Sequence, residues 1–544
     1  MRFFGSWILL LISMLGLAQP LQQKHSFSKQ DSLRGSNNEF RDWWDVQHYK
    51  LSVTPHFDKK YVEGVNEITF FIQNENVERS IMQIDLQEPM KLDKVLYRGK
   101  TLSYIREGNV YFIDFSQTKF KEREQKISLF YSGYPKVANN PPWDGGWIFK
   151  TDEKGRPWMS VACQGLGASV WYPNKDYLGD EPNRGATFTI ETQGDLVAVG
   201  NGRLKKKEKN RYTWEVTQPI NNYNIVPYIG YYVNFKDEYA GEAGHLDLDY
   251  WVLDYNIDKA KKQFQQVKPM MQAFENWFGP YPFYEDSYKL VEAPHLGMEH
   301  QSNVAYGNRY QNGYKGRDLS GSGWGLKWDF IIIHETGHEW YGNNITNQDI
   351  ADMWIHESFT SYSETLYIES LYGKEAANDY VIGTRKAILN DIPIIGVYGV
   401  NQEGSGDMYY KGANMLHTLR QLMEDDELFK KLLRGMNKEF YHQTVTTEQI
   451  EAYISKVTGK DLTSFFNQYL RTTQIPILEY SIEGSYLSYR WKNNVEGFDM
   501  PVKLANSDAW IFPTSEWKKE KLRKKDLKKF QIDRNFYIQV KRID

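Results

Sequence analysis

Two histidines and two glutamates share one short segment, residues 331–340, which reads Ile-Ile-Ile-His-Glu-Thr-Gly-His-Glu-Trp. Residues four apart lie on the same face of a helix, so the rings of His334 and His338 can converge on one metal ion. Glu335 directly follows the first histidine and can reach a water molecule bound to that ion. The spacing predicts a helix that binds a zinc ion at a site of hydrolysis.

A third candidate ligand, Glu357, follows His338 by nineteen residues. Catalytic zinc typically takes three protein ligands and keeps a fourth position for water or substrate. His334, His338 and Glu357 supply that number and type of ligand. Glu335 then stays free to act as the general base on the zinc-bound water.

The alternative is an ordinary helix in which H-E-x-x-H arises by chance, as short motifs do. The apolar lead-in 330–333 argues against chance, because a metal-binding helix must be buried. Gly337 inside the helix costs about 1 kcal/mol relative to alanine, which implies a close neighbour at that point. His356 and Glu339 each adjoin a predicted ligand and must point elsewhere, because neighbours on a helix do not face together. We expect structural roles for both.

These motifs resemble the gluzincin aminopeptidases of the aminopeptidase N type, a family that includes the leukotriene hydrolases. The likeness is carried by His-Glu-Trp-Tyr-Gly-Asn-Asn-Ile-Thr at 338–346 and Asp-Met-Trp-Ile-His-Glu-Ser-Phe at 352–359, and it extends from about residue 45 to residue 470. The resemblance implies one zinc ion per chain and an aminopeptidase that removes N-terminal residues from peptides. It also implies a β-saddle, a thermolysin-like catalytic domain and a β-domain, without the long helical C-terminal domain of larger relatives.

The family receives the substrate's α-ammonium with a Gly-x-Met-Glu-Asn strand, which segment 296–300, Leu-Gly-Met-Glu-His, resembles. The resemblance implies that Glu299 binds the amine, since a charged hydrogen bond is strong when it is desolvated. Gly297 and Met298 would bind the substrate backbone as an edge strand, which tolerates side-chain changes. Leu296 and His300 depart from the family pattern, so the side-chain preference stays open. The alternative for Glu299 is an ordinary surface glutamate.

Two further residues take roles from the resemblance. Tyr409, in Met-Tyr-Tyr-Lys-Gly-Ala at 408–413, matches the phenol that donates to the oxyanion of the transition state. Its neighbour Tyr410, or a purely structural tyrosine, is the alternative. Gln164 matches the glutamine on the strand that lines the first specificity pocket, where it would help to hold the amino end. A merely exposed glutamine is the alternative there, and Cys163 beside it is expected to be a small buried side chain.

The elements that position these residues change type along the chain. At 544 residues the chain needs several domains. Short alternating strands between residues 46 and 235 predict a β-sandwich or saddle, helical spacing begins near residue 258, and alternation returns after Pro476. We therefore predict a multidomain α+β fold with a β-saddle at 45–240, a mainly helical thermolysin-like catalytic domain at 241–472 and a small β-domain at 473–544.

The N-terminus has the pattern of an export signal. Arg2 precedes an apolar run from Trp7 to Leu17, too short for a membrane span, with small residues at a cleavage position near residue 18. We expect residues 1–18 to be a signal peptide, residues 19–44 to be flexible, and the protein to be periplasmic or extracellular without stable membrane insertion. An uncleaved anchor is the alternative. Cys163 is the only cysteine, so no internal disulfide can form.

The overall composition and charge of the chain exclude few classes of function. A formal net charge of −4 gives no sign of a nucleic-acid partner, and the expected partners are peptides with a free N-terminus. One rival function is hydrolysis of another amide or of an epoxide. The other is a non-catalytic peptide-binding module, which the complete set of His334, Glu335, His338 and Glu357 argues against. The preferred first residue and the oligomeric state stay open.

Overall fold

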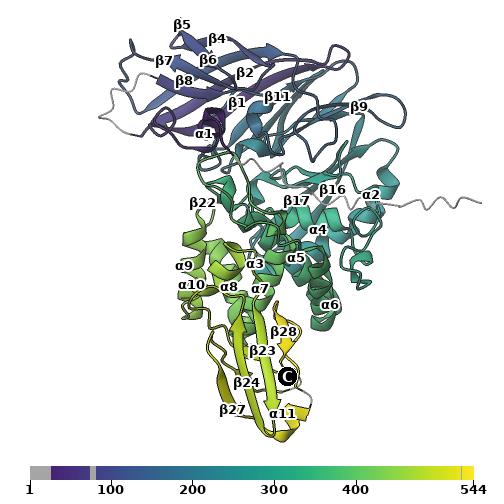
Figure 1. Ribbon diagram of the computed structural model, residues 1–544. Helices are drawn as coiled ribbons and strands as arrows, with labels where there is room; N and C mark the ends of the chain where they lie inside the picture. The colour runs from purple at the N-terminus through teal and green to yellow at the C-terminus, as the bar shows by residue number, and fades with distance from the viewer. Residues whose placement is uncertain (1–25, 74–80, 506, 529, 544) are drawn as a thin grey trace, which may run out of the picture.

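The computed structural model describes residues 26–73, 81–505, 507–528 and 530–543. They form three parts, which Figure 1 shows from top to bottom: a β-rich N-terminal part, a mainly helical middle part and a small β-rich C-terminal part. This arrangement confirms the predicted multidomain α+β fold class. The predicted signal peptide lies outside the described residues. Within the described ranges, no helix combines the length and the apolar character needed to cross a lipid bilayer.

Three sheets build the N-terminal part. Their strands are β1 Trp44–His56, β2 Tyr61–Ile72, β3 Ile81–Asp85, β4 Lys91–Tyr97, β5 Lys100–Thr101, β6 Tyr104–Glu107, β7 Val110–Asp114, β8 Glu124–Gly133, β9 Gly146–Thr151, β10 Pro157–Ala162, β11 Ala186–Glu191, β12 Val197–Val199, β13 Arg203–Glu208, β14 Arg211–Val216 and β15 Tyr228–Gly230. The largest sheet has the order β13-β14-β11-β1-β2-β8-β4-β5, and the others are β12-β15-β10-β9 and β3-β7-β6. Strand β1 pairs antiparallel with β2 and parallel with β11. Burial largely alternates along β1, as the sequence pattern predicts for a strand with one face in the core.

A five-stranded sheet opens the middle part and positions the predicted amine-binding segment. Its strands are β16 Tyr232–Gly241, β17 Gly244–Leu253, β18 Tyr288–Glu292, β19 Gly297–Met298 and β20 Val304–Tyr306. They run in the order β16-β17-β18-β20-β19, so β19 lies at an edge. The predicted domain boundary at residue 240 falls inside the hairpin of β16 and β17, whose ladder extends from Tyr232 to Gly241. Both strands belong to this sheet.

Helices fill the rest of the middle part. They are α2 Ile257–Gln263, α3 Val267–Phe278, α4 Phe330–Gly337, α5 Trp354–Tyr372, α6 Lys374–Thr384, α7 Tyr410–Met423, α8 Asp426–Glu439, α9 Thr447–Thr458 and α10 Thr463–Leu470. The helical spacing predicted from near residue 258 corresponds to α2 and α3, which a 3-10 turn at Phe264–Gln266 separates. Pro269, three residues after this turn, has no N–H to bond to the carbonyl four residues earlier. A capping box of Thr446 and Gln449 begins α9.

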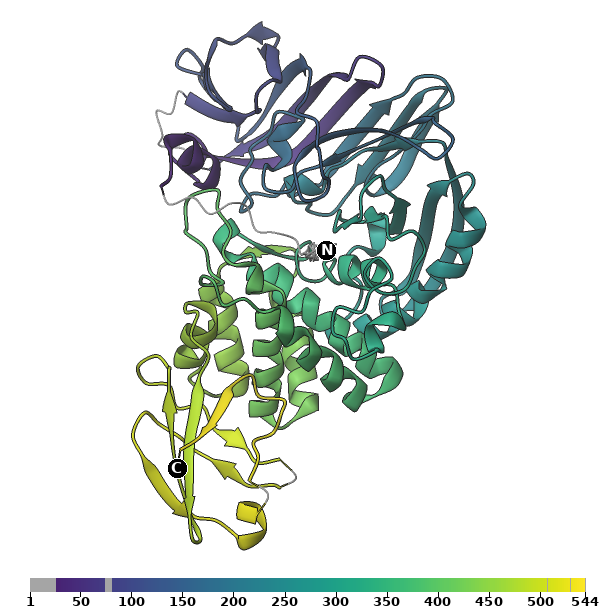
Figure 2. The same ribbon diagram turned by 45° about the vertical axis from the view of Figure 1, so that its right-hand side comes forward.

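The C-terminal part is a small β-structure at the far end of the molecule from the N-terminal sheets (Figure 2). Its strands are β23 Ile477–Glu483, β24 Tyr486–Lys492, β25 Val502–Lys503, β26 Trp510–Ile511, β27 Lys518–Lys521 and β28 Gln539–Arg542, with the short helix α11 Lys524–Lys528. The main sheet has the order β27-β24-β23-β28. Arg385 of the helical part donates to the backbone carbonyls of Arg534 and Asn535, at 2.8 and 3.0 Å, and so ties the two parts together.

The segment predicted to be flexible, residues 19–44, is structured where it is described. Residues 29–35 form the helix α1 (Lys29–Gly35), which begins at a capping box between Ser28 and Asp31. Leu33 packs in a small apolar cluster with strand residues of the N-terminal part. Arg41 is fully buried, and its guanidinium lies 2.5 Å from the carboxylate of Asp85. The flexibility prediction is wrong for residues 29–44, because a helix cap, a buried ion pair and the buried side chains of Leu33, Trp43 and Trp44 hold this stretch in place.

Candidate active site

Helix α4 presents the two histidines from a buried position. The Asp329 side chain caps its N-terminus by accepting from the backbone N–H groups of Ile331 and Ile332. A Cβ added at Gly337 would lie 2.6 Å from Ser363 Oγ, so glycine at this position lets α5 approach closely. Regular helix ends at Gly337, and His338 occupies the C-cap position. The close packing of α4 on α5 is what brings Glu357 to the two histidines.

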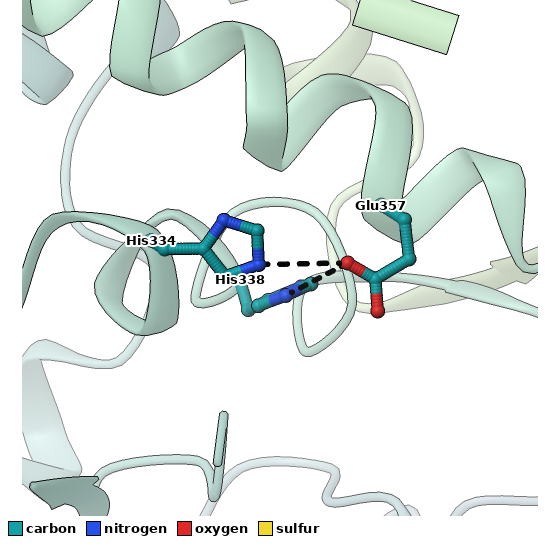
Figure 3. A group of neighbouring side chains, drawn as sticks. All are labelled: His334, His338 and Glu357. Carbon is teal, nitrogen blue, oxygen red and sulfur yellow. Dashed lines mark ion pairs between the residues drawn. The ribbon is translucent and has the colours of Figure 1, made fainter. Parts of the chain in front are cut away.

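The structure brings His334, His338 and Glu357 together as a candidate metal site (Figure 3). Glu357 Oε2 lies 3.6 Å from His334 Nε2 and 3.4 Å from His338 Nε2. This oxygen is buried and makes no hydrogen bond. Ligands about 2.0–2.1 Å from a tetrahedral zinc ion lie about 3.4 Å from one another, which is the spacing seen here. The three side chains therefore fit a zinc ion.

The outer nitrogens of both histidines are held in place by further contacts. His334 Nδ1 lies 2.7 Å from Glu364 Oε1, and the Tyr380 hydroxyl donates to the other oxygen of Glu364 at 2.6 Å. His338 Nδ1 lies 3.0 Å from the carbonyl of Tyr341. These contacts orient the inner Nε2 atoms toward the metal position. Burial lowers the pKa of His334, but Glu357 and Glu364 outweigh burial and hold it well above its usual value, so the cluster favours positive charge at its centre.

Glu364 was not predicted from the sequence. It follows Glu357 by seven residues, two turns along the same face of α5. That spacing is a signal from which it could have been found.

Glu335 faces the active-site cavity, which has a volume of about 400 Å³ and also borders the three candidate ligands. Burial raises the pKa of its carboxyl group to about 7, against the opposing effect of the two histidines. The backbone of β19 lies directly against it, because a Cβ at Gly297 would approach Glu335 Oε1 to 2.6 Å. Glycine at this position therefore lets the strand lie beside this carboxylate without displacing it.

Glu299 lies at the end of β19, on the same cavity. Ligand atoms of Glu299, Glu335 and His338 all lie within 4.8 Å of one another, so two carboxylates converge beside the metal position. Glu299 accepts a hydrogen bond from the hydroxyl of Tyr223 at 3.0 Å. The N-terminal part supplies Tyr223, and the sequence carried no signal for it. Gln164 and Met298 line the cavity next to Glu299, as the resemblance implies.

The structure distinguishes the two neighbouring tyrosines. The Tyr409 hydroxyl donates to Glu357 Oε1 at 2.9 Å, and its ring stacks on His334 with the centroids 6.0 Å apart. Burial, together with the carboxylate of Glu357, raises the pKa of Tyr409 well above its usual value, so the phenol keeps its proton. Tyr410 lines the cavity but has no such bond to a ligand among the described residues. The hydroxyl beside the metal position is that of Tyr409.

The side chains that adjoin predicted ligands point elsewhere. His356 Nε2 accepts from the backbone N–H of Asn347 at 2.9 Å, and Glu339 accepts from the backbone N–H of Ser302 at 2.8 Å. Of the two departures from the family strand, Leu296 lines the active-site cavity, whereas His300 is fully buried and contacts the hydroxyl of Tyr228. Only the first departure can therefore touch a substrate directly.

The chain is similar to known peptidases. The chain is 26% identical over 355 residues to aminopeptidase B of Rattus norvegicus. The aligned region covers 60% of this chain and 51% of that protein. It is 22% identical over 330 residues to leukotriene A-4 hydrolase of Xenopus laevis. That alignment covers 57% of this chain and 51% of the hydrolase. The chain thus spans about half the length of the curated relatives it matches.

Among solved structures, an M1 zinc metallopeptidase from Deinococcus radiodurans, whose mutant was crystallised with a Tyr-Ser-Ala substrate, shares the fold with a TM-score of 0.67. Its identity is 18%, and the match covers 83% of this chain and 99% of that one. Residues 262–469, which hold α4, α5 and Tyr409, match the peptidase family M1 domain. The resemblance to gluzincin aminopeptidases is thereby confirmed, and the segment that carries the candidate metal site belongs to peptidase family M1.

Proposed function

We propose that the chain is a zinc aminopeptidase that hydrolyses the first peptide bond of peptides with a free N-terminus. The observation that carries this proposal is the approach of Glu299 to Glu335 and His338, within 4.8 Å. Two carboxylates this close repel each other unless a cation lies between or beside them. The α-ammonium of a peptide substrate can be this cation. When it lies beside the metal ligands, the first peptide carbonyl lies next to the general base Glu335.

The roles of the individual residues follow from their positions. A bound zinc ion, held by His334, His338 and Glu357, would act as a Lewis acid and make water nucleophilic at neutral pH. Glu335 takes the proton from the attacking water and returns it to the leaving amine. Tyr409 donates a hydrogen bond to the carbonyl oxygen as negative charge develops on it.

Binding of the amino end completes the arrangement. Glu299, supported by Tyr223 and by Gln164 beside it, holds the α-ammonium. Gly297 and Met298 lie on the edge strand β19, whose free edge offers backbone groups to an extended peptide. The substrate is thus fixed at its charged end and along its backbone.

Hydrolysis of amino-acid anilides by the wild type and by Glu335→Gln tests the proposal. The variant should retain one zinc ion per chain, because Glu335 is not among the three ligands. Its kcat should fall by about 10²- to 10⁴-fold, as loss of a general base does. A variant that keeps zinc and also keeps wild-type turnover would exclude Glu335 as the base.

We also propose that the protein is exported and matures by cleavage near residue 18. The support is the pattern of Arg2, the apolar run to Leu17 and the small residues that follow. N-terminal sequencing of the protein recovered from the periplasm or medium of an expressing bacterium should begin near Gln19. Recovery with Met1 intact from the cytoplasm would contradict export.

A further inference from the structure

The N-terminal segment reaches the active site. Gly35, at the end of α1, packs against the loop near residue 400 so closely that a Cβ would lie 2.2 Å from the backbone of Val400. The backbone N–H of Asn401 donates to the carbonyl of Asp31, and its side chain donates to the carbonyl of Gly165, beside Gln164. Helix α1 therefore joins the catalytic part and the N-terminal part at the rim of the candidate active site.

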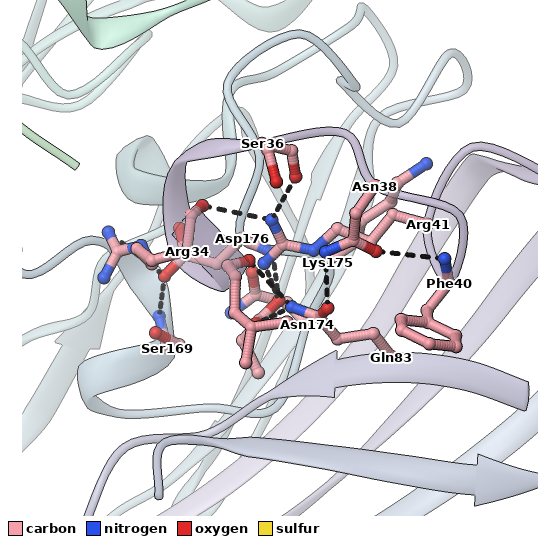
Figure 4. Close-up of polar contacts among 12 residues, drawn as sticks. Arg34, Ser36, Asn38, Phe40, Arg41, Gln83, Ser169, Asn174, Lys175 and Asp176 are labelled. Atoms are coloured by element: carbon pink, nitrogen blue, oxygen red, sulfur yellow. Dashed lines mark hydrogen bonds and ion pairs between the residues drawn. The ribbon is translucent and has the colours of Figure 1, made fainter. Parts of the chain in front are cut away.

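Buried ionic contacts fix the position of α1. The fully buried guanidinium of Arg41 donates to the carbonyls of Arg34 and Ser36, each at 3.0 Å (Figure 4). The carboxylate of Asp85 lies on the other side of that guanidinium. Since both carbonyls belong to the C-terminal end of α1, the backbone that carries Arg34 is held rigidly.

The side chain of Arg34 points from this end into the interior. Its guanidinium donates to the carbonyl of Leu166 and lies 3.4 Å from Asp176 Oδ2. The side chain is 18% exposed, and its open face borders a cavity of about 80 Å³. A Cβ at Gly167 would collide with both Arg34 and Asp176, so glycine there makes room for the pair.

This small cavity continues the active-site cavity beyond Glu299. The two share Gln164, Met298 and Glu299. The walls of the small cavity carry four carboxyl groups, whereas Arg34 is the one positively charged side chain among its described lining residues. The acidic groups are Asp176, Glu299, Asp349 and Glu403. A substrate whose ammonium lies at Glu299 therefore has this cavity beside it as a space for its first side chain.

We propose that Arg34 is a specificity-determining residue that occupies the acidic far end of the first-side-chain pocket and so disfavours the basic first residues that this acidic lining would otherwise attract. This inference rests on the proposed aminopeptidase function. A lysine or arginine at the first position would bring a second cation beside Arg34, which costs free energy in a partly buried site. Without Arg34, the substrate's own cation could take the same partners, Asp176 and the carbonyl of Leu166.

The test compares kcat/KM for the anilides of leucine and arginine in four proteins. Arg34→Ala removes both the charge and the bulk, and Arg34→Met removes the charge while keeping most of the bulk. Lys29→Ala is the matched control, because Lys29 lies on the same helix but pairs with Glu107 on the exposed surface. Zinc content and thermal midpoint confirm that each variant is folded.

We expect Arg34→Ala to raise the arginine-to-leucine ratio by at least about tenfold, the order of one like-charge contact in a pocket. Arg34→Met should raise it less, and Lys29→Ala should leave it within about twofold of the wild type. An unchanged ratio in both Arg34 variants, with leucine anilide still hydrolysed, would overturn the inference. Absence of anilide hydrolysis by the zinc-loaded wild type would instead overturn the proposed function.

Discussion

Replacement of Glu364 by glutamine tests how the metal site is held. In the wild type, His334 Nδ1 lies 2.7 Å from a carboxylate oxygen that is itself fixed by Tyr380. Glutamine keeps an acceptor of the same shape but removes the charge. A hydrogen bond to a charged group stabilises by about 1.5–3 kcal/mol and a neutral one by about 0.5–1.5, so the loss is about 1–2 kcal/mol. The Kd for zinc should therefore rise about 5- to 30-fold.

The assay is competition for zinc against a chelator of known affinity, with the metal-free proteins first shown to share one thermal midpoint. Tyr380→Phe is the matched control, because it removes the other hydrogen bond of the same carboxylate and leaves its charge in place. We expect its Kd for zinc to stay within about threefold of the wild type. If Glu364→Gln binds zinc as the wild type does, or if Tyr380→Phe weakens binding equally, the carboxylate charge does not support His334.

Three further predictions concern other parts of the site and the fold. Tyr409→Phe should lower kcat for anilides by about 10²- to 10³-fold with little change in KM, as loss of one oxyanion donor does; an unchanged kcat would exclude that role. Asp329→Ala should lower the free energy of unfolding by about 2 kcal/mol. It removes the N-cap of α4 and leaves the hydroxyl of Tyr306, which donates to Asp329 at 2.7 Å, without its acceptor. A denaturant titration that shows no loss would contradict the capping argument. Burial lowers the pKa of His417 to about 3 in the folded protein. Between pH 6.5 and pH 3 this side chain therefore binds more protons in the unfolded chain than in the folded one, and the free energy of unfolding falls as the pH falls. From pH 6.5 to 4.5 the wild type should lose about 2–3 kcal/mol more than His417→Gln in the same titration; parallel losses in the two proteins would contradict it.

The part of the site that could be predicted from the sequence depends on local geometry. A four-residue spacing puts His334 and His338 on one face of a helix, whatever the rest of the chain does. The position of Glu357 was predicted from its distance along the chain and from the family resemblance. Glu364, two helical turns after Glu357, was open to the same reasoning.

The residues that could not be predicted come from distant segments. Tyr223 belongs to the N-terminal part and contacts Glu299 only because the two parts pack together. Arg34 lies in a polar stretch that composition marks as flexible. Its order depends on Arg41, whose burial against Asp85 has no local signature. The pairing of β17 with β18, which places the hairpin of β16 and β17 in the sheet of β19, likewise joins segments that are distant in the sequence.

The central claim, recognition of a free N-terminus by Glu299, is tested most directly by one pair of substrates. The measurement is the ratio of kcat/KM for a short peptide with a free amine to that for the same peptide N-acetylated. The wild type should favour the free amine by about 100-fold or more, because acetylation removes the positive charge that the carboxylate of Glu299 would bind. Glu299→Gln should reduce that preference to about tenfold or less, chiefly through slower cleavage of the free peptide. Equal or faster hydrolysis of the acetylated peptide by the wild type would contradict the account.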